Sequence, residues 1–105
     1  MTGRKDDSGK DRFDLLLPEF EQAVAKVLTM GAAKYEPNSW QHVEDAKNRY
    51  YAALRRHLNA WRQGEKTDKE SGLNHLAHVA CNTMFLLWFD QNETKQLAME
   101  ALEDE

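Results

Sequence analysis

Apolar residues recur at spacings of three and four along three stretches of the chain, and this period is typical of amphipathic helices. The first stretch begins at Pro18, because proline suits the first turn of a helix and acidic residues follow it at once. It is predicted to end near Tyr35, because Pro37 disfavours helical geometry at Glu36.

Two more helices are predicted after a loop at residues 36–42. The second helix runs from about 43 to 63, where Gly64 is well placed to end it. A short acidic loop follows at 64–70. The third helix is predicted to start from a cap at Glu70 or Ser71 and to run to about residue 90.

The two ends of the chain carry weaker signals. Residues 93–102 after Asn92 indicate a short C-terminal helix, and residues 93–105 are assigned to a weak helix or tail. Residues 1–12 are predicted to form a flexible arm with a glycine-centred turn at 7–10. No stretch alternates apolar and polar residues over five or more positions, so the predicted fold class is all-α, a single small helical bundle over residues 1–105.

The third helix is apolar on nearly every side. One face carries Leu73, Leu76, Ala77, Ala80, Met84, Leu87 and Trp88. A second face carries His75, His78, Asn82, Phe85 and Phe89. One chain of 105 residues would struggle to cover both faces, so a homodimer or homotetramer is predicted.

Composition and charge exclude several classes of protein. The net charge of −4 does not fit a general binder of polymeric nucleic acid, which needs a basic surface. The longest apolar run, 84–89, is too short to span a membrane, and the charged N-terminus lacks the apolar core of a signal peptide. A single cysteine, Cys81, fits a reducing cytoplasm and is interpreted as a packing residue. A cytoplasmic protein is therefore expected, in the host cytoplasm if a phage encodes it.

Ionisable residues gather where the second and third predicted helices join. Within 22 residues the chain places His57, Glu65, Asp68, Glu70, His75 and His78. Each histidine alone could be a hydrogen-bonded core residue, but the whole group indicates a site. Carboxylate oxygens select Mg²⁺ or Mn²⁺, and added imidazoles favour Mn²⁺, Co²⁺ or Zn²⁺.

Other residues are candidates for binding a phosphorylated substrate. The basic candidates for phosphate contact are Lys10, Arg12, Lys34, Arg55 and Arg56, with His57 beside the last two. Trp40 and Asn38 form a possible base-reading pair, because an indole can stack on a purine and an amide can bond a base edge. The alternative for Trp40 is that it closes the core beneath the loop.

Five segments resemble those of a known family. These are DSGKxR…LLP near the N-terminus, GAxKY at 31–35, NxW at 38–40, RHLxAW at 56–61 and GExxDxESGLxHLAH at 64–78. Together they resemble the dATP/dGTP diphosphohydrolase N-terminal domain family, known mostly from bacteriophages and related to the MazG-like nucleoside triphosphate pyrophosphohydrolases. The resemblance implies a helical, oligomeric, Mg²⁺-dependent enzyme. Such an enzyme would cleave a deoxynucleoside triphosphate to the monophosphate and pyrophosphate.

The ligands of the MazG-like superfamily cannot be carried over directly. That superfamily holds metal with ExxE and ExxD motifs. Here Arg56 lies near the second ExxE position, and His75 and His78 lie near the ExxD position.

Roles are therefore assigned from this chain's own residues. The predicted metal ligands are Glu65, Asp68, Glu70 and His78, and the predicted catalytic residues are Glu70, His75 and His78. The predicted substrates are the purine deoxynucleotides dGTP and dATP. Two alternatives stay open, a non-catalytic nucleotide-binding or helical partner protein and a phosphohydrolase that releases nucleoside and triphosphate.

Overall fold

The computed structural model of the chain describes residues 2–103, apart from the side chain of Gln96. Three α-helices make up most of it, and two short 3₁₀ helices precede the first and second of them. The elements in chain order are η1 (Phe13–Leu15), α1 (Pro18–Lys34), η2 (Ser39–His42), α2 (Ala46–Arg62) and α3 (His75–Glu103). Within residues 2–103 there is no strand, and one isolated bridge joins Thr67 to Asn74. The all-α prediction is confirmed.

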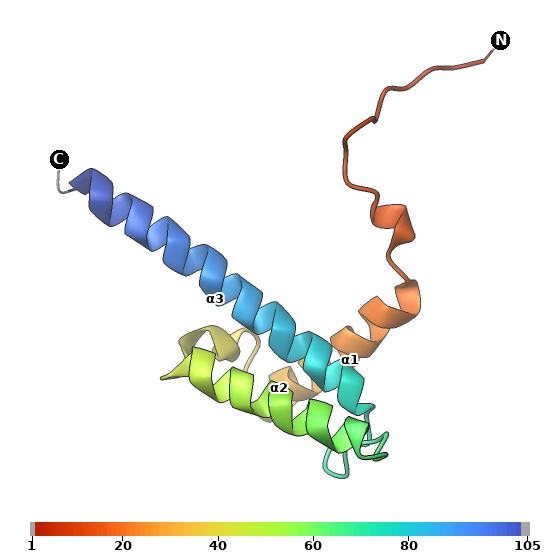
Figure 1. Cartoon of the computed structure of the whole chain (residues 1–105), viewed down its shortest axis with the longest axis vertical. Helices are drawn as coiled ribbons and strands as arrows, with labels where there is room; N and C mark the ends of the chain where they lie inside the picture. Colours follow the sequence, from red (N-terminus) through yellow and green to blue (C-terminus); the bar gives the residue numbers. More distant parts are fainter. Residues whose placement is uncertain (1, 104–105) are drawn as a thin grey trace.

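α2 and α3 lie side by side and run antiparallel, as Figure 1 shows, and α1 crosses α3 near its N-terminal end. The C-terminal half of α3 and the N-terminal segment extend away from this centre in different directions. His57, His75 and His78 therefore lie close together at the joined end of this hairpin.

An aromatic cluster packs η2 against α2 and α3. Trp40 stacks on Phe85 with ring centroids 4.3 Å apart and an interplanar angle of 19°. Trp88 and Phe89 present their rings to Trp40 edge-on, at 5.1 and 6.0 Å. The Tyr50 hydroxyl donates a hydrogen bond to the Trp40 carbonyl at 3.0 Å. The 3₁₀ turn of η2, where a loop was predicted, thus holds Trp40 over α3.

The most buried apolar residues of α2 and α3 are small. Cys81 is 1% exposed, and Ala46 and Ala77 are each 7% exposed. Burial raises the pKa of the Cys81 thiol to about 11. The interpretation of Cys81 as a packing residue is confirmed, because a buried thiol with a raised pKa carries little thiolate.

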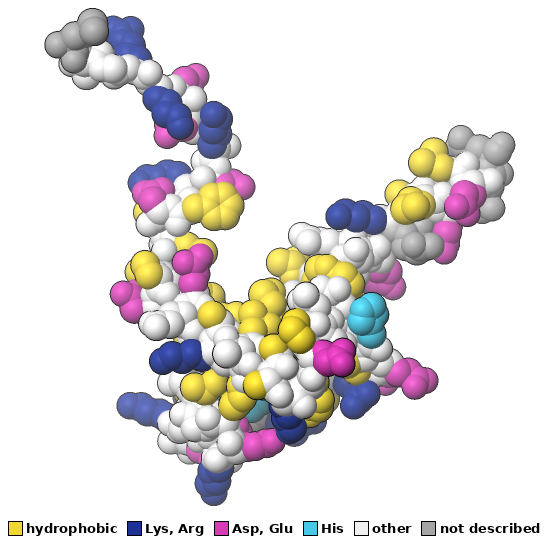
Figure 2. Space-filling view, turned by 180° about the vertical axis from the view of Figure 1, so that it is seen from behind, with side chains coloured by type: hydrophobic (Ala, Val, Ile, Leu, Met, Phe, Trp, Pro, Cys, Tyr) yellow, Lys and Arg dark blue, Asp and Glu magenta, His cyan; other side chains and the backbone are white. Residues whose placement is uncertain are grey.

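Many large apolar side chains remain exposed. On the segment before and at the start of α1 they are Phe13, Leu15, Leu16, Leu17 and Phe20, and on α3 they include Leu76, Met84 and Leu87. Figure 2 shows hydrophobic side chains at the surface of the N-terminal segment and again over the middle of the molecule. Of the two predicted faces of the third helix, the histidine-bearing one packs inward.

The boundaries of two predicted helices need correction. α2 begins at Ala46 rather than near 43, because Asp45 has a left-handed backbone (φ 54°). α3 begins at His75 rather than at 70 or 71, because Asn74 is the residue that caps it: its Oδ1 accepts the Leu76 N–H at 2.8 Å.

The predicted break before a separate C-terminal helix is absent. α3 continues to Glu103, and the side-chain amide of Asn92 donates a hydrogen bond to the Trp88 carbonyl at 2.9 Å within the helix. No glycine or proline follows residue 72, so nothing in the sequence stops the helix there. Residues 104 and 105 of the predicted tail lie outside the described residues.

The turn predicted at residues 7–10 is present. The Lys10 N–H donates to the Asp7 carbonyl at 3.1 Å, and Gly9 has φ 77°. The flexibility of the arm stays a prediction.

Candidate functional site

The site begins where α2 stops. The Gly64 N–H donates to the Trp61 carbonyl, and the Glu65 N–H donates to the Ala60 carbonyl, both at 3.0 Å. With Gly64 at φ 101°, these two bonds form a Schellman motif. The prediction that Gly64 ends the helix is confirmed, and the reversal turns Glu65 back toward the start of α3.

Hydrogen bonds brace the loop between α2 and α3. Asp68 Oδ2 accepts the Ser71 N–H at 2.8 Å. The Asp68 N–H donates to the Leu73 carbonyl and the Gly72 N–H donates to the Asp68 carbonyl, each at 2.8 Å. Gly72 has φ 73°, a conformation that a side chain would strain. The loop therefore holds the Asp68 carboxylate in a fixed direction.

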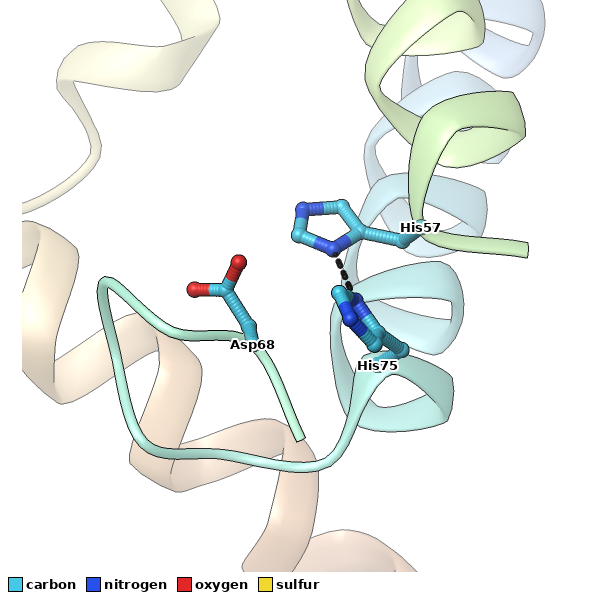
Figure 3. Close-up of side chains that lie close together, drawn as sticks. All are labelled: His57, Asp68 and His75. Atoms are coloured by element: carbon cyan, nitrogen blue, oxygen red, sulfur yellow. Dashed lines mark hydrogen bonds between the residues drawn. The ribbon is translucent and has the colours of Figure 1, made fainter. Parts of the chain in front are cut away.

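Three histidines meet beside this loop. His57 on α2 and His75, the first residue of α3, bring their Nδ1 atoms to 2.8 Å from each other. His78, one turn later on α3, stacks on His57 with centroids 4.3 Å apart and an interplanar angle of 6°. Figure 3 shows the Asp68 carboxylate beside the His57 and His75 rings.

The carboxylates approach the histidines from the loop. Glu65 Oε2 lies 3.4 Å from His75 Nε2. This contact is close enough for an ion pair but lacks hydrogen-bond geometry, so His75 Nε2 is buried without a hydrogen-bond partner. On the other ring, His78 Nε2 and the Ser71 Oγ are 2.7 Å apart, while Asp68 Oδ2 is 3.9 Å from the same nitrogen.

Burial and the neighbouring charges set the protonation of the site. Burial lowers the pKa of His57, and the nearby His78 lowers it further. Burial also lowers the pKa of His78, although Asp68 opposes this. Burial alone would raise the pKa of Asp68, but the hydrogen bonds from Ser71 outweigh it and the pKa lies below its usual value. At neutral pH His57 and His78 are therefore neutral and the Asp68 carboxylate is ionised.

This arrangement has the donors of a metal site. One ligand atom from each of His57, Asp68 and His75 lies within 4.8 Å of the others. The three come from α2, the loop and α3, so only the folded hairpin brings them together. Neutral imidazole nitrogen and carboxylate oxygen are both common ligands of divalent cations.

The structure places the predicted ligands and catalytic residues in two groups. Glu65, Asp68, His75 and His78 lie together with His57, as described above. Glu70 does not join them through any described hydrogen bond or ion pair with a histidine. Its side chain is 80% exposed and its Oε1 lies 3.1 Å from Lys34 Nζ. This hydrogen bond raises the pKa of Lys34 and ties the end of α1 to the loop.

The predicted base-reading residues line a cavity beside the histidines. Asn38, Trp40 and His78 border a space of about 460 Å³ between the end of α1, η2 and α3. Asn38 has a left-handed backbone (φ 63°) just before η2. Trp40 gives one face to Phe85, so it closes the core and also borders the cavity.

The predicted phosphate-binding residues are spread more widely. Arg56 borders a second space of about 620 Å³ that shares Trp40 with the first. Arg55 donates to the Tyr51 hydroxyl at 2.8 Å. Arg12 pairs with Asp14 at 2.7 Å on the N-terminal arm, which extends away from the hairpin. Lys10 lies on the same arm, in its turn.

The sequence did not predict two residues of the candidate site, Ser71 and Asn82. Ser71 was interpreted as a possible helix cap, but it bonds both Asp68 and His78. The spacing Asp-x-x-Ser-Gly, which favours a side chain-to-backbone turn, is the local signal for it. Asn82 is 7% exposed, borders the 460 Å³ cavity, and donates to the His78 carbonyl at 2.8 Å. Only its helical spacing from His78 hinted at this position.

None of the helices within residues 2–103 is long and apolar enough to cross a membrane. No solved structure matches the chain. The likeness to MazG-like folds therefore stays a prediction.

Comparison with known proteins identifies the family to which the chain belongs. Residues 1–99 match the family described as dATP/dGTP diphosphohydrolase, N-terminal. A Salmonella phage PMBT28 protein named dATP/dGTP diphosphohydrolase is 38% identical over 92 residues. The match covers 88% of this chain but 31% of that protein, so the chain spans about a third of the relative's length. The chain therefore belongs to the dATP/dGTP diphosphohydrolase N-terminal family.

Proposed function

We propose that the chain hydrolyses purine deoxynucleoside triphosphates, dGTP or dATP, to the monophosphate and pyrophosphate with the help of a divalent cation. The observation that carries this proposal is the position of His78. It borders the cavity that Asn38 and Trp40 line. It also stacks on His57, which is one of the three possible metal ligands. A nucleoside in the cavity would therefore place its phosphates close to the cation. The family of the chain and the name of its phage relative support the choice of substrate.

The chain's own residues have separable roles in this proposal. Asp68, His57 and His75 hold the cation. The resemblance to the family implies Mg²⁺, whereas two imidazole donors favour a transition-metal ion such as Mn²⁺. When bound, such an ion lowers the pKa of an attacking water and neutralises charge on the phosphates. His78, kept neutral by burial, is able to accept the proton of that water.

The ion pair between Lys34 and Glu70 has a further role in this proposal. Lys34 is paired with Glu70 in the free chain and is exposed enough to turn to a phosphate. Glu70 then becomes free to approach the cation, which would reconcile its present position with its expected role. Asn38 and Trp40 bind the base. Arg55, Arg56 and, from the arm, Lys10 and Arg12 are further candidates for phosphate contact.

A screen of the four deoxynucleoside triphosphates with Mg²⁺ and with Mn²⁺ tests the proposal. Products are separated by chromatography. Monophosphate plus pyrophosphate from dGTP or dATP is the expected result, and loss of turnover in excess chelator should accompany it. Nucleoside plus triphosphate would instead show a phosphohydrolase of the other type.

His78→Gln provides the residue-level test. The amide is able to keep the contact with Ser71 but does not titrate near neutrality, so the variant should fold and lose at least about tenfold in turnover. His42→Gln is the matched control, because His42 is exposed in η2 near the opposite end of α2. Equal rates for His78→Gln and the control would remove His78 from the mechanism.

One observation favours a second function, a nucleotide-binding module without turnover. The chain corresponds to 31% of its phage relative, so the remaining part of that protein has room for a separate catalytic domain. Binding of dGTP or dATP measured by calorimetry, with no product after long incubation, would support this alternative.

We also propose that the chain assembles as a homodimer or homotetramer. Leu76, Met84 and Leu87 follow one face of α3 and are 39%, 37% and 56% exposed. Together with the exposed apolar residues at 13–20 they leave large apolar side chains uncovered, and exposed apolar patches often mark protein–protein interfaces. Light scattering at micromolar concentration tests this, and a stable monomer would contradict it.

A further inference from the structure

Two imidazole nitrogens face each other at the centre of the site. The Nδ1 atoms of His57 and His75 are 2.8 Å apart. A hydrogen bond between them requires one ring to be protonated at Nδ1 and the other to be free there. A cation beside both nitrogens would satisfy the two lone pairs at once. The Asp68 carboxylate, with an oxygen within 4.8 Å of one ring nitrogen of each histidine, adds a negative charge to the same space.

Two of these donors have neighbours that are able to position them as metal ligands. A metal-bound histidine usually donates its other ring N–H to a carboxylate or carbonyl. When His75 binds through Nδ1, its Nε2 carries the proton and faces Glu65 Oε2 at 3.4 Å. The 4% exposed His75 thus has a buried Nε2 with a carboxylate oxygen nearby and no hydrogen bond to it. A cation on Nδ1 would make the Nε2–H a stronger donor and favour closing this contact. The Ser71 N–H similarly fixes Asp68 through Oδ2.

The donor set favours one class of cation. Mg²⁺ prefers oxygen ligands in an octahedral shell and keeps several waters. Two imidazole nitrogens and one carboxylate instead suit zinc, cobalt or manganese. The set also leaves coordination positions open for water or a phosphate oxygen, as catalytic sites do.

We propose that His57, Asp68 and His75 bind one first-row transition-metal ion per chain, of the zinc, cobalt or manganese class, in preference to Mg²⁺, and that Glu65 and Ser71 position two of these ligands. His78 is a neighbour and not a ligand, because its Nε2 is engaged with the Ser71 hydroxyl. The proposal deepens the proposed function and rests on it for the role of the ion. Binding itself is measured without substrate.

The experiment uses the untagged full chain after treatment with chelator and dialysis. Zn²⁺, Co²⁺ and Mg²⁺ are titrated separately by calorimetry, and the visible spectrum of the Co²⁺ sample reports nitrogen ligation. The expected result is one Zn²⁺ or Co²⁺ per chain, bound at least about 100-fold more tightly than Mg²⁺. Either of two results with the wild-type chain overturns the proposal without any variant. These are Mg²⁺ binding as tight as Zn²⁺ binding, and no Zn²⁺ binding at about 100 μM.

Variants then locate the ion. His75→Gln should weaken Co²⁺ binding by at least about 100-fold, and Glu65→Gln by about tenfold, because it removes only an outer contact. His42→Gln should bind as the wild type does, and helicity by circular dichroism checks each fold. Equal loss in His42→Gln and His75→Gln refutes the location. Co²⁺ binding without any nucleotide turnover would refute the proposed hydrolysis and leave the metal site standing. Turnover by a wild-type chain that binds neither Zn²⁺ nor Co²⁺ would do the reverse.

Discussion

Replacing Trp40 by alanine should remove a large part of the stability of this fold. The indole stacks on Phe85 at 4.3 Å and meets Trp88 and Phe89 edge-on, so it joins η2 to α3 through three ring contacts. Deleting a buried tryptophan side chain costs about 3–5 kcal/mol, and each favourable ring pair contributes about 0.5–1.5 kcal/mol of such a total. Because Trp40 is only partly buried, we expect a loss of about 3 kcal/mol, the lower end of that range.

The loss is measured by urea unfolding followed by circular dichroism at one protein concentration. A domain of this size has about 5–15 kcal/mol in total, so Trp40→Ala should lower the midpoint strongly and Tm by about 12–24 °C. Trp61→Ala is the control, because Trp61 is 39% exposed near the end of α2 and should cost about 1 kcal/mol. Equal losses in the two variants would refute the assignment of Trp40 to the core.

Trp40→Phe separates packing from the proposed contact with the base. Phenylalanine keeps an aromatic face against Phe85, so stability should fall by about 1 kcal/mol. A marked loss of dGTP or dATP affinity in this folded variant would show that the indole touches the nucleotide. Unchanged affinity would leave Trp40 with its structural role alone.

Three further predictions concern separate features of the fold. The Cys81 thiol, buried and with its pKa raised to about 11, should resist alkylation by iodoacetamide at pH 8 until urea unfolds the chain, and rapid labelling of the folded chain would contradict its burial. Asn74→Ala should cost about 0.5–2 kcal/mol in thermal unfolding through loss of the α3 cap, and Asn74→Gly only a few tenths of a kcal/mol. Lys47→Ala should lower Tm only slightly, because its ion pairs with Asp90 and Glu93 are half-exposed, and about 0.5 M salt should erase the difference.

The sequence determined the local features of this protein. The period of three and four predicted three helices, and Gly64 marked the end of α2, because a left-handed residue there completes a motif with the last carbonyls of the helix. The short loop after Gly64 made α2 and α3 antiparallel neighbours, which places His57, His75 and His78 at one end. Each of these conclusions depends on residues close together in the chain.

The tertiary structure alone decided which side chains meet. No spacing rule could show that Glu70 pairs with Lys34 of α1, while Glu65 and Asp68 approach the histidines. The reason is that such pairs depend on rotamers and on distances between separate elements, to a fraction of an ångström. The start of α3 was missed for a related reason. Asp68 and Ser71 form a hydrogen bond with each other within the loop, so neither of them starts the helix. The helix begins only after Asn74 caps it, and its first residue, His75, faces His57.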